Sequence, residues 1–119
     1  MKFFICTFDS ILLGIPSDRI ERIIPVNEAQ DTALTVSIPD MFRLKDRASV
    51  HALVLKAPVD NTVFLVPRIE NELEIPEENI QCLPQTLSEM IIFCNGVYFT
   101  DTTMILTLDP DKLLENIAL

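Results

Sequence analysis

The residues that could carry chemistry are few and widely spaced. Three cysteines, Cys6, Cys82 and Cys94, form no close pair, and His51 is the single histidine among 119 residues. A structural metal site needs several Cys or His ligands at short spacing, and a catalytic histidine needs a partner group within reach. We therefore predict no metal-binding and no catalytic residues, and we interpret His51 as a structural or surface residue.

The sequence also gives little support for a phosphate-binding loop or a calcium-binding loop. The chain has two glycines, Gly14 and Gly96, whereas phosphate-cradling loops use several closely spaced glycines. An acidic run from Glu70 to Glu78 lacks the spaced Asp or Asn ligands and the turn glycine of a calcium loop. We interpret this run as a solvated face. The sequence predicts a protein that is not an enzyme and needs no cofactor.

The composition restricts the cellular compartment and the classes of binding partner that we expect. Hydrophobic residues make up 49% of the chain, which favours a folded core over disorder. A net charge of −9 argues against nucleic acid or an anionic membrane as partner, because both attract clustered Lys and Arg. An odd number of scattered cysteines fits a reducing compartment. Neither a signal peptide nor a spanning segment is expected, so we predict a cytoplasmic protein without membrane insertion.

One stretch of the chain occurs twice. Asp9 to Pro25 and Asp60 to Pro76 align without a gap at a constant offset of 51 residues, with five identical positions. The identical residues are Asp9/Asp60, Pro16/Pro67, Glu21/Glu72, Ile24/Ile75 and Pro25/Pro76. Such self-similarity is typical of one supersecondary unit used twice. Coincidence between two apolar runs that each end in proline is the alternative. At this length, two units must share one core, so we expect a single domain over residues 1–119, with repeat units near 3–49 and 50–119.

The local patterns predict short strands and few helices. Strands are expected at residues 3–8, 11–15, 35–38, 50–56, 63–66, 80–83, 90–94, 97–100 and 104–108. Turns are expected at residues 9–10, 58–61 and 101–103, and Asn95-Gly96 is the strongest hairpin signal. Ile20, Ile23 and Ile24 share one face of a helix that Ser17 would cap and Pro25 would end. Residues 69–73 are compatible with one helical turn that runs into a strand.

The C-terminus predicts a final helix. Asp109 and Pro110 form a cap and a first-turn proline, and Leu113, Leu114 and Ile117 supply a buried stripe. Many short strands with few helices are typical of small β-barrels.

Three segments together resemble the chemotaxis coupling-protein family, the CheW-like domains. NGVYFTDTTMILTLDPDKLL, Asn95 to Leu114, resembles the closing hairpin and helix of that family. VFLVPRIENELEIPEENIQCLP is similar to its strand, short helix and strand before a proline-containing loop, and ILLGIPSDRIERII is similar to its opening. Pro67 stands where the family usually has an acidic residue, and Arg22 where it commonly has Glu.

The resemblance implies a mainly β fold of two intertwined, SH3-like five-stranded barrels related by pseudo-symmetry, with a C-terminal helix. It also indicates that the first lobe is truncated. Pro76 to Asp109 spans 33 residues in the second repeat, whereas the apparent counterpart, Pro25 to Asp40, spans 15. About 18 residues are missing where the family has a glycine-containing hairpin with an Arg-Gly pair. We expect two absent strands and an open sheet edge, covered by residues 27–35 or completed by a partner, including a second copy.

The resemblance implies a non-catalytic adaptor that bridges chemoreceptor tips and the regulatory domain of a histidine kinase. By position, Ile20, Arg22 and Ile23 are the docking candidates, although Ile20 and Ile23 could equally be core residues. The missing Arg-Gly hairpin puts receptor coupling in doubt. A small ligand-binding barrel and a self-associating signalling modulator are the alternatives, and an enzyme would need a reactive constellation that the sequence does not show.

Overall fold

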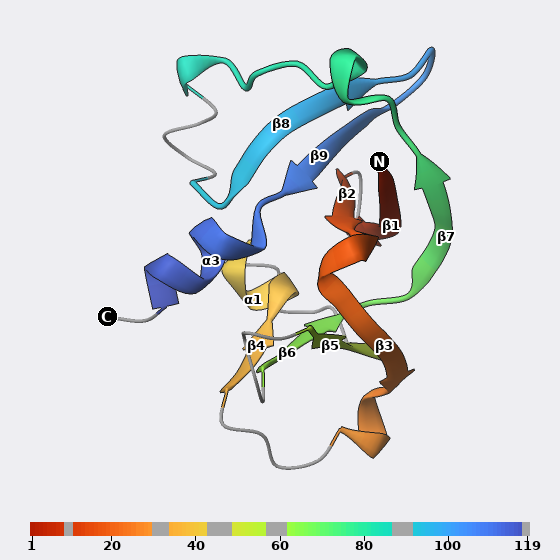
Figure 1. Cartoon of the computed structure of the whole chain (residues 1–119), viewed down its shortest axis with the longest axis vertical. Coiled ribbons are helices and arrows are strands. Elements are labelled where there is room, and N and C mark those ends of the chain that lie inside the picture. Colours follow the sequence, from red (N-terminus) through yellow and green to blue (C-terminus); the bar gives the residue numbers. More distant parts are fainter. Residues whose placement is uncertain (9–10, 30–33, 43–48, 57–61, 87–91, 118–119) are drawn as a thin grey trace.

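The chain forms two β-sheets that share one core (Figure 1). The computed structural model describes residues 1–8, 11–29, 34–42, 49–56, 62–86 and 92–117. The described strands are β1 Lys2–Phe8, β2 Ile11–Pro16, β3 Ile20–Pro25, β4 Leu34–Ser37, β5 His51–Leu55, β6 Thr62–Val66, β7 Ile69–Glu74, β8 Cys94–Phe99 and β9 Met104–Leu108. One sheet has the order β7-β1-β2-β9-β8 and the other the order β3-β5-β6-β4.

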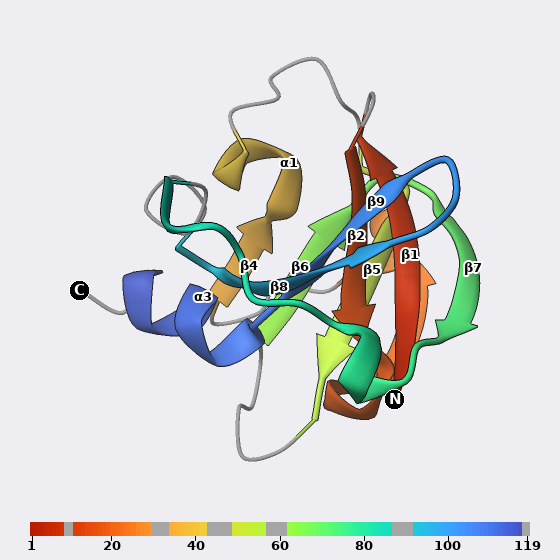
Figure 2. The ribbon, with the colours of Figure 1, turned by 90° about the horizontal axis from the view of Figure 1, so that it is seen from above.

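Each sheet contains strands from both halves of the chain. β1 and β2 form an antiparallel pair, after which β3 crosses to the other sheet and pairs with β5. β5 and β6 form the second antiparallel pair, after which β7 crosses back and pairs with β1. The two three-strand units therefore share one order and exchange their third strand (Figures 1 and 2). The short 3-10 helices η2 (Val26–Glu28) and η3 (Glu77–Asn79) follow these third strands at the 51-residue offset of the sequence repeat.

Within the described residues, the four-stranded sheet has no counterpart of β8. β9 adds to β2 in parallel, and β4 adds to β6 in the same way. Helix α1 (Ile38–Met41) follows β4 as helix α3 (Pro110–Ile117) follows β9. The predicted mainly β class with two intertwined, SH3-like lobes and a truncated first lobe is confirmed. In the described residues the two sheets do not close into barrels, and the smaller sheet is one strand short rather than two.

The main core is built by residues from both sheets. Leu13 of β2, Leu53 of β5 and Phe64 of β6 are fully buried in one cluster, together with Leu108 of β9 and Leu113 of α3. Burying a side chain of this size stabilises a fold by about 1.5–3 kcal/mol. A second cluster of four buried residues, Phe3, Ile5, Ile75 and Ile105, covers the opposite face of β1. Both clusters include residues from both halves of the chain, so the two halves share these cores.

The helix predicted after Ser17 is wrong. Ser17–Arg19 forms one 3-10 turn, η1, and Ile20–Pro25 is strand β3. A β-bulge at Glu21 explains the misleading pattern, because Ile20 pairs with Leu55 and Ile23 pairs with Leu53, two positions on one face of β5. The extra residue puts isoleucines three positions apart on the same face, which imitates helical spacing.

The helical turn predicted for residues 69–73 is also wrong. This segment is strand β7, which pairs with β1 over its whole length and has its own register shift between the partners of Ile5 and Cys6. The short helix follows the strand instead, as η3. The predicted strand at residues 80–83 is reduced to one bridge between Gln81 and Val97.

The hairpin predicted at Asn95-Gly96 does not form. Both residues lie inside β8, where a bulge separates the partners of Cys94 and Gly96. The glycine is required by packing, since a Cβ on Gly96 would lie 2.6 Å from Cγ2 of Ile80. The predicted hairpin between residues 97–100 and 104–108 is confirmed as β8–β9. The turns predicted at residues 9–10 and 58–61 lie outside the described residues, as do residues 90–91 of the strand predicted at residues 90–94. Of the three described residues of that predicted strand, only Cys94 belongs to a strand, as the first residue of β8.

Candidate functional site

The three predicted docking residues lie on β3 and face different surroundings. Ile20 is 6% exposed and belongs to the main core, so its core interpretation is correct. Arg22 is exposed, and Ile23 keeps 38% of its surface exposed. Only Arg22 and Ile23 are therefore available to a partner.

β3 is an edge strand of the four-stranded sheet. It pairs with β5 on one side, and no other described strand pairs with its opposite side. An unpaired strand edge offers backbone donors and acceptors that can hydrogen-bond a partner chain. The exposed side chains of Glu21, Arg22 and Ile23 follow one another along this edge. We call the outer side of β3, with these three residues, the β3 edge.

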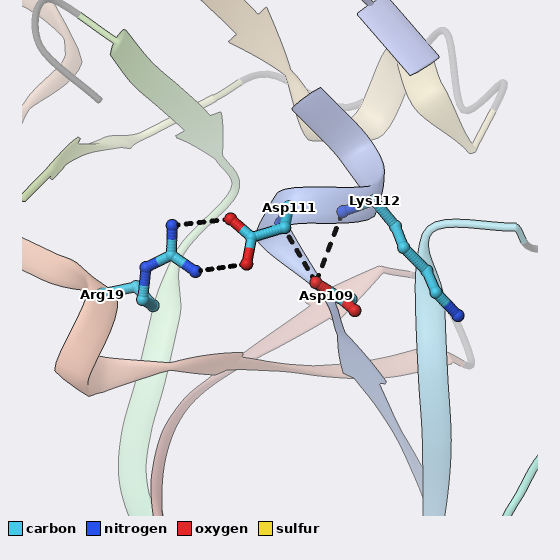
Figure 3. Close-up of polar contacts among 4 residues, drawn as sticks. All are labelled: Arg19, Asp109, Asp111 and Lys112. Atoms are coloured by element: carbon cyan, nitrogen blue, oxygen red, sulfur yellow. Dashed lines mark hydrogen bonds and ion pairs between the residues drawn. The ribbon is translucent and has the colours of Figure 1, made fainter. Parts of the chain in front are cut away.

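An ion pair holds the segment that leads into the β3 edge (Figure 3). Arg19, the last residue of η1, donates from Nη1 and Nη2 to the two carboxylate oxygens of Asp111 in α3, at 3.0 and 2.9 Å. The carbonyl of Arg19 also accepts a hydrogen bond of 3.0 Å from the backbone N–H of Lys56. These contacts place the start of β3 against the C-terminal helix and against the end of β5.

Asp109 organises the other side of this contact. Its Oδ1 accepts hydrogen bonds from the backbone N–H groups of Asp111 and Lys112, so the predicted cap of the final helix is confirmed (Figure 3). Leu113 is buried as predicted. The capped first turn orients the Asp111 carboxylate toward Arg19, which follows the general preference for acidic side chains at helix N-termini.

The ion pair changes the electrostatics of both partners. The hydrogen bond and charge of Arg19 hold the pKa of Asp111 below its ordinary value. The carboxylate of Asp111 raises the pKa of Arg19 in turn. The two residues are 92 positions apart, and no local pattern in the sequence pairs them. The contact between Arg19 and Asp111 was therefore not predictable from the sequence.

His51 has a structural role. It opens β5, as the sequence indicated, and its Nδ1 accepts a hydrogen bond of 3.3 Å from the backbone N–H of Ile69. Ile69 begins β7, the strand that crosses between the sheets. The imidazole therefore connects the four-stranded sheet to this crossover.

The buried cysteines and the metal-ligand side chains of the described residues form no reactive site. Burial raises the pKa of Cys6 and of Cys94 to about 12, so both thiols stay protonated at neutral pH. In the described ranges, no group of three or more His, Cys, Asp or Glu side chains could hold a metal ion. None of the described helices has the length and apolar character needed to cross a membrane.

A small cavity lies in the five-stranded lobe. Its volume is about 270 Å³, and Phe3, Pro16, Leu108, Glu77, Asn95 and Thr107 contribute to its walls. The hydroxyl of Thr107 donates to Oδ1 of Asn95 at 2.6 Å, so these polar groups already satisfy each other. Ligand sites are typically about 300–1,000 Å³ and have converging polar groups. The β3 edge is therefore the better candidate for a functional site.

The comparisons with known proteins support the fold. No protein-family description matches the sequence, and no curated protein matches it. The structure is similar to the crystal structure of the scaffolding protein TtCheW from Thermoanaerobacter tengcongensis, with a TM-score of 0.72 and 12% sequence identity. The similarity covers 90% of this chain and 82% of that chain. The chain therefore has a CheW-like fold.

Proposed function

We propose that this chain is a single CheW-like domain that acts as a non-catalytic adaptor in cytoplasmic chemotaxis-type signalling. Its partners are the regulatory domain of a histidine kinase, the cytoplasmic tips of chemoreceptors, or both. The observation that carries the proposal is a CheW-like fold that leaves the β3 edge unpaired by described strands and exposes Arg22 and Ile23 along it.

The chemistry of the β3 edge suits protein recognition. Ile23 supplies apolar area at the rim of the core, and Arg22 supplies a charged group of the type often found at the centre of interfaces. No ion-pair partner of Arg22 is found in the described residues. The backbone of β3 can add hydrogen bonds in register with a partner strand.

A binding experiment with matched variants tests the proposal. The purified chain is titrated with a kinase regulatory domain and with a receptor tip fragment, and Arg22→Glu and Ile23→Asp are compared with wild type. Glu28→Lys, an exposed change in η2, serves as the charge control. We expect both β3 variants to weaken binding of at least one partner by about tenfold or more. Wild-type chain that binds neither partner would contradict the adaptor function.

Self-association is the second candidate function. The observation that favours it is the smaller sheet, which has no counterpart of β8 in the described part of the chain. A second copy could supply the missing pairing by strand exchange. Size-exclusion chromatography with light scattering tests this directly, because a strictly monomeric chain at high concentration contradicts completion by a second copy.

A further inference from the structure

Two large apolar side chains are exposed side by side at the tip of the β8–β9 hairpin. Phe99 ends β8 and is 52% exposed, and Met104 begins β9 and is 39% exposed. The two residues are direct cross-strand partners. Paired residues of an antiparallel ladder project from the same face, so Phe99 and Met104 form one apolar patch. We call this patch and the turn at residues 100–103 the hairpin tip.

The turn of the hairpin tip is closed by hydrogen bonds among its own residues. The Oγ1 of Thr100 accepts from the backbone N–H groups of Thr102 and Thr103, at 3.3 and 2.8 Å. The hydroxyls of Thr100 and Thr103 lie 2.6 Å apart, and the backbone N–H of Thr100 donates to the carbonyl of Thr103. A surface ordered before binding loses less conformational entropy when a partner binds. The patch is therefore presented in a preorganised form.

The charge of the hairpin tip limits the partner's chemistry. From Cys94 to Leu108 the hairpin has a single charged residue, Asp101, which is exposed beside the patch. The whole chain has a net charge of −9. An apolar pocket with Lys or Arg at its rim is the complementary surface, because like charges at an interface rim oppose association.

The hairpin tip is far from the β3 edge. Figure 1 places the tip at the upper end of the molecule's longest axis and the end of β3 toward the lower end. The two elements belong to different sheets. The hairpin tip and the β3 edge are therefore separate surfaces.

We propose that the hairpin tip is a second docking surface, which inserts Phe99 and Met104 into an apolar pocket rimmed by Lys or Arg on a second protein partner. This inference rests on the proposed adaptor function and adds to it, because the chain then binds two partners at the same time through opposite ends. Aromatic and methionine side chains are enriched at the centres of interfaces, and a few residues buried in pockets of the partner carry most of the binding energy.

The experiment compares four variants against the same two purified probes, the kinase regulatory domain and the receptor tip fragment. Phe99→Ala and Met104→Ala remove the patch, and Asp101→Lys reverses its charge. Ile92→Ala is the matched control, because Ile92 is 48% exposed just before the opposite end of β8. The thermal unfolding midpoint of each variant is measured first, and variants that unfold at the wild-type temperature are used.

We expect Phe99→Ala and Asp101→Lys each to lower the affinity for the same one of the two probes by about tenfold or more. The affinity for the other probe should stay at the wild-type value. Ile23→Asp in β3 should lower the affinity for the other probe. The wild-type chain should bind both probes in one ternary complex. If the Phe99 and Met104 variants bind both probes as wild type does, the hairpin-tip proposal is overturned and the adaptor function stands. If wild type binds neither probe, both proposals are overturned. Loss of self-association alone in the Phe99 variant would identify a second copy as the occupant and overturn the two-partner proposal.

Discussion

The guanidinium of Arg19 makes two parallel hydrogen bonds to the carboxylate of Asp111, although 92 residues separate them in the sequence. The pair joins η1, at the crossover between the sheets, to the first turn of α3 (Figure 3). It therefore links the start of the β3 edge to the C-terminal helix. Both side chains are partly solvated, which limits the free energy that the pair contributes.

A double-mutant cycle measures this contribution. We expect Arg19→Ala and Asp111→Ala each to lower the free energy of unfolding, with a coupling energy of about 0.5–1 kcal/mol between them. The cycle separates the pair from the interaction of Asp111 with the helix dipole. Urea unfolding of wild type, the two single variants and the double variant gives the four values. Additive losses, with no coupling, would show that the bidentate contact is not maintained in solution.

The same pair sets a dependence of stability on pH. Arg19 lowers the pKa of Asp111 in the folded state relative to the unfolded chain. The contribution is therefore fully present above the unfolded pKa of an aspartate, about 3.9, and is lost as the pH falls through the lower folded value. Arg19 remains charged throughout this range, because an arginine side chain stays protonated at acidic and neutral pH.

The measurement compares wild type with Asp111→Asn. The difference in unfolding midpoint between the two should be constant from pH 7 to about pH 5 and should shrink as the pH falls below about 4. A difference that grows at low pH would contradict the direction of the shift.

Gly96 shows where turn chemistry misled the sequence interpretation. The Asn-Gly pair is the strongest short hairpin signal, yet the structure uses Gly96 inside β8 so that the segment at Gln81 can approach. The backbone groups of Gln81 and Val97 exchange hydrogen bonds of 2.8 and 2.9 Å across this contact. Local patterns cannot distinguish a glycine needed for a turn from one needed for a close approach.

Replacing Gly96 by alanine tests this explanation. The new Cβ would lie 2.6 Å from Ile80 and 3.0 Å from the carbonyl oxygen of Gln81, so either the backbone or the side chain must shift. We expect a loss of about 1–3 kcal/mol in the free energy of unfolding. Gly14→Ala is the matched control, because its nearest contacts would be ordinary ones at 3.4 Å and its cost should stay below about 1 kcal/mol. Equal losses at both positions would refute the packing explanation.

Elements that depend on local sequence were predicted correctly, whereas elements that depend on contacts between distant residues were not. Strands such as β1, β2, β5, β6 and β9 were predictable because apolar and β-branched residues favour a pleated, buried surface over four to seven positions. The final helix was predictable because Asp109 and Pro110 act locally. β3 and β7 were not, because a bulge gives the isoleucines of β3 helical spacing and because each strand pairs with a partner from the other repeat unit.

The surroundings of the three docking candidates were not predictable from the sequence. The pattern that placed Ile20, Arg22 and Ile23 together contains no information on burial at a sheet edge. The sequence did not indicate the exposed pair Phe99 and Met104, because the local pattern of each residue is that of an ordinary strand position. Their exposure depends on where the hairpin leaves the sheet, which is a property of the tertiary structure.

Ile20 and Ile23 separate packing from recognition within one strand. Ile20 lies in the main core at 6% exposure, so Ile20→Ala should lower the free energy of unfolding by about 2–5 kcal/mol. Ile23 is not part of either buried cluster, and Ile23→Ala should change the free energy of unfolding by about 0.5 kcal/mol or less. Partner binding should show the reverse order, provided that Ile20→Ala is assayed where it remains folded. Thermal unfolding of both variants measures their stability, and titration of each variant with the kinase regulatory domain measures its affinity for the partner. A folded Ile20→Ala that loses binding as strongly as Ile23→Ala would mean that the β3 edge acts through the backbone geometry of β3 rather than through its exposed side chains.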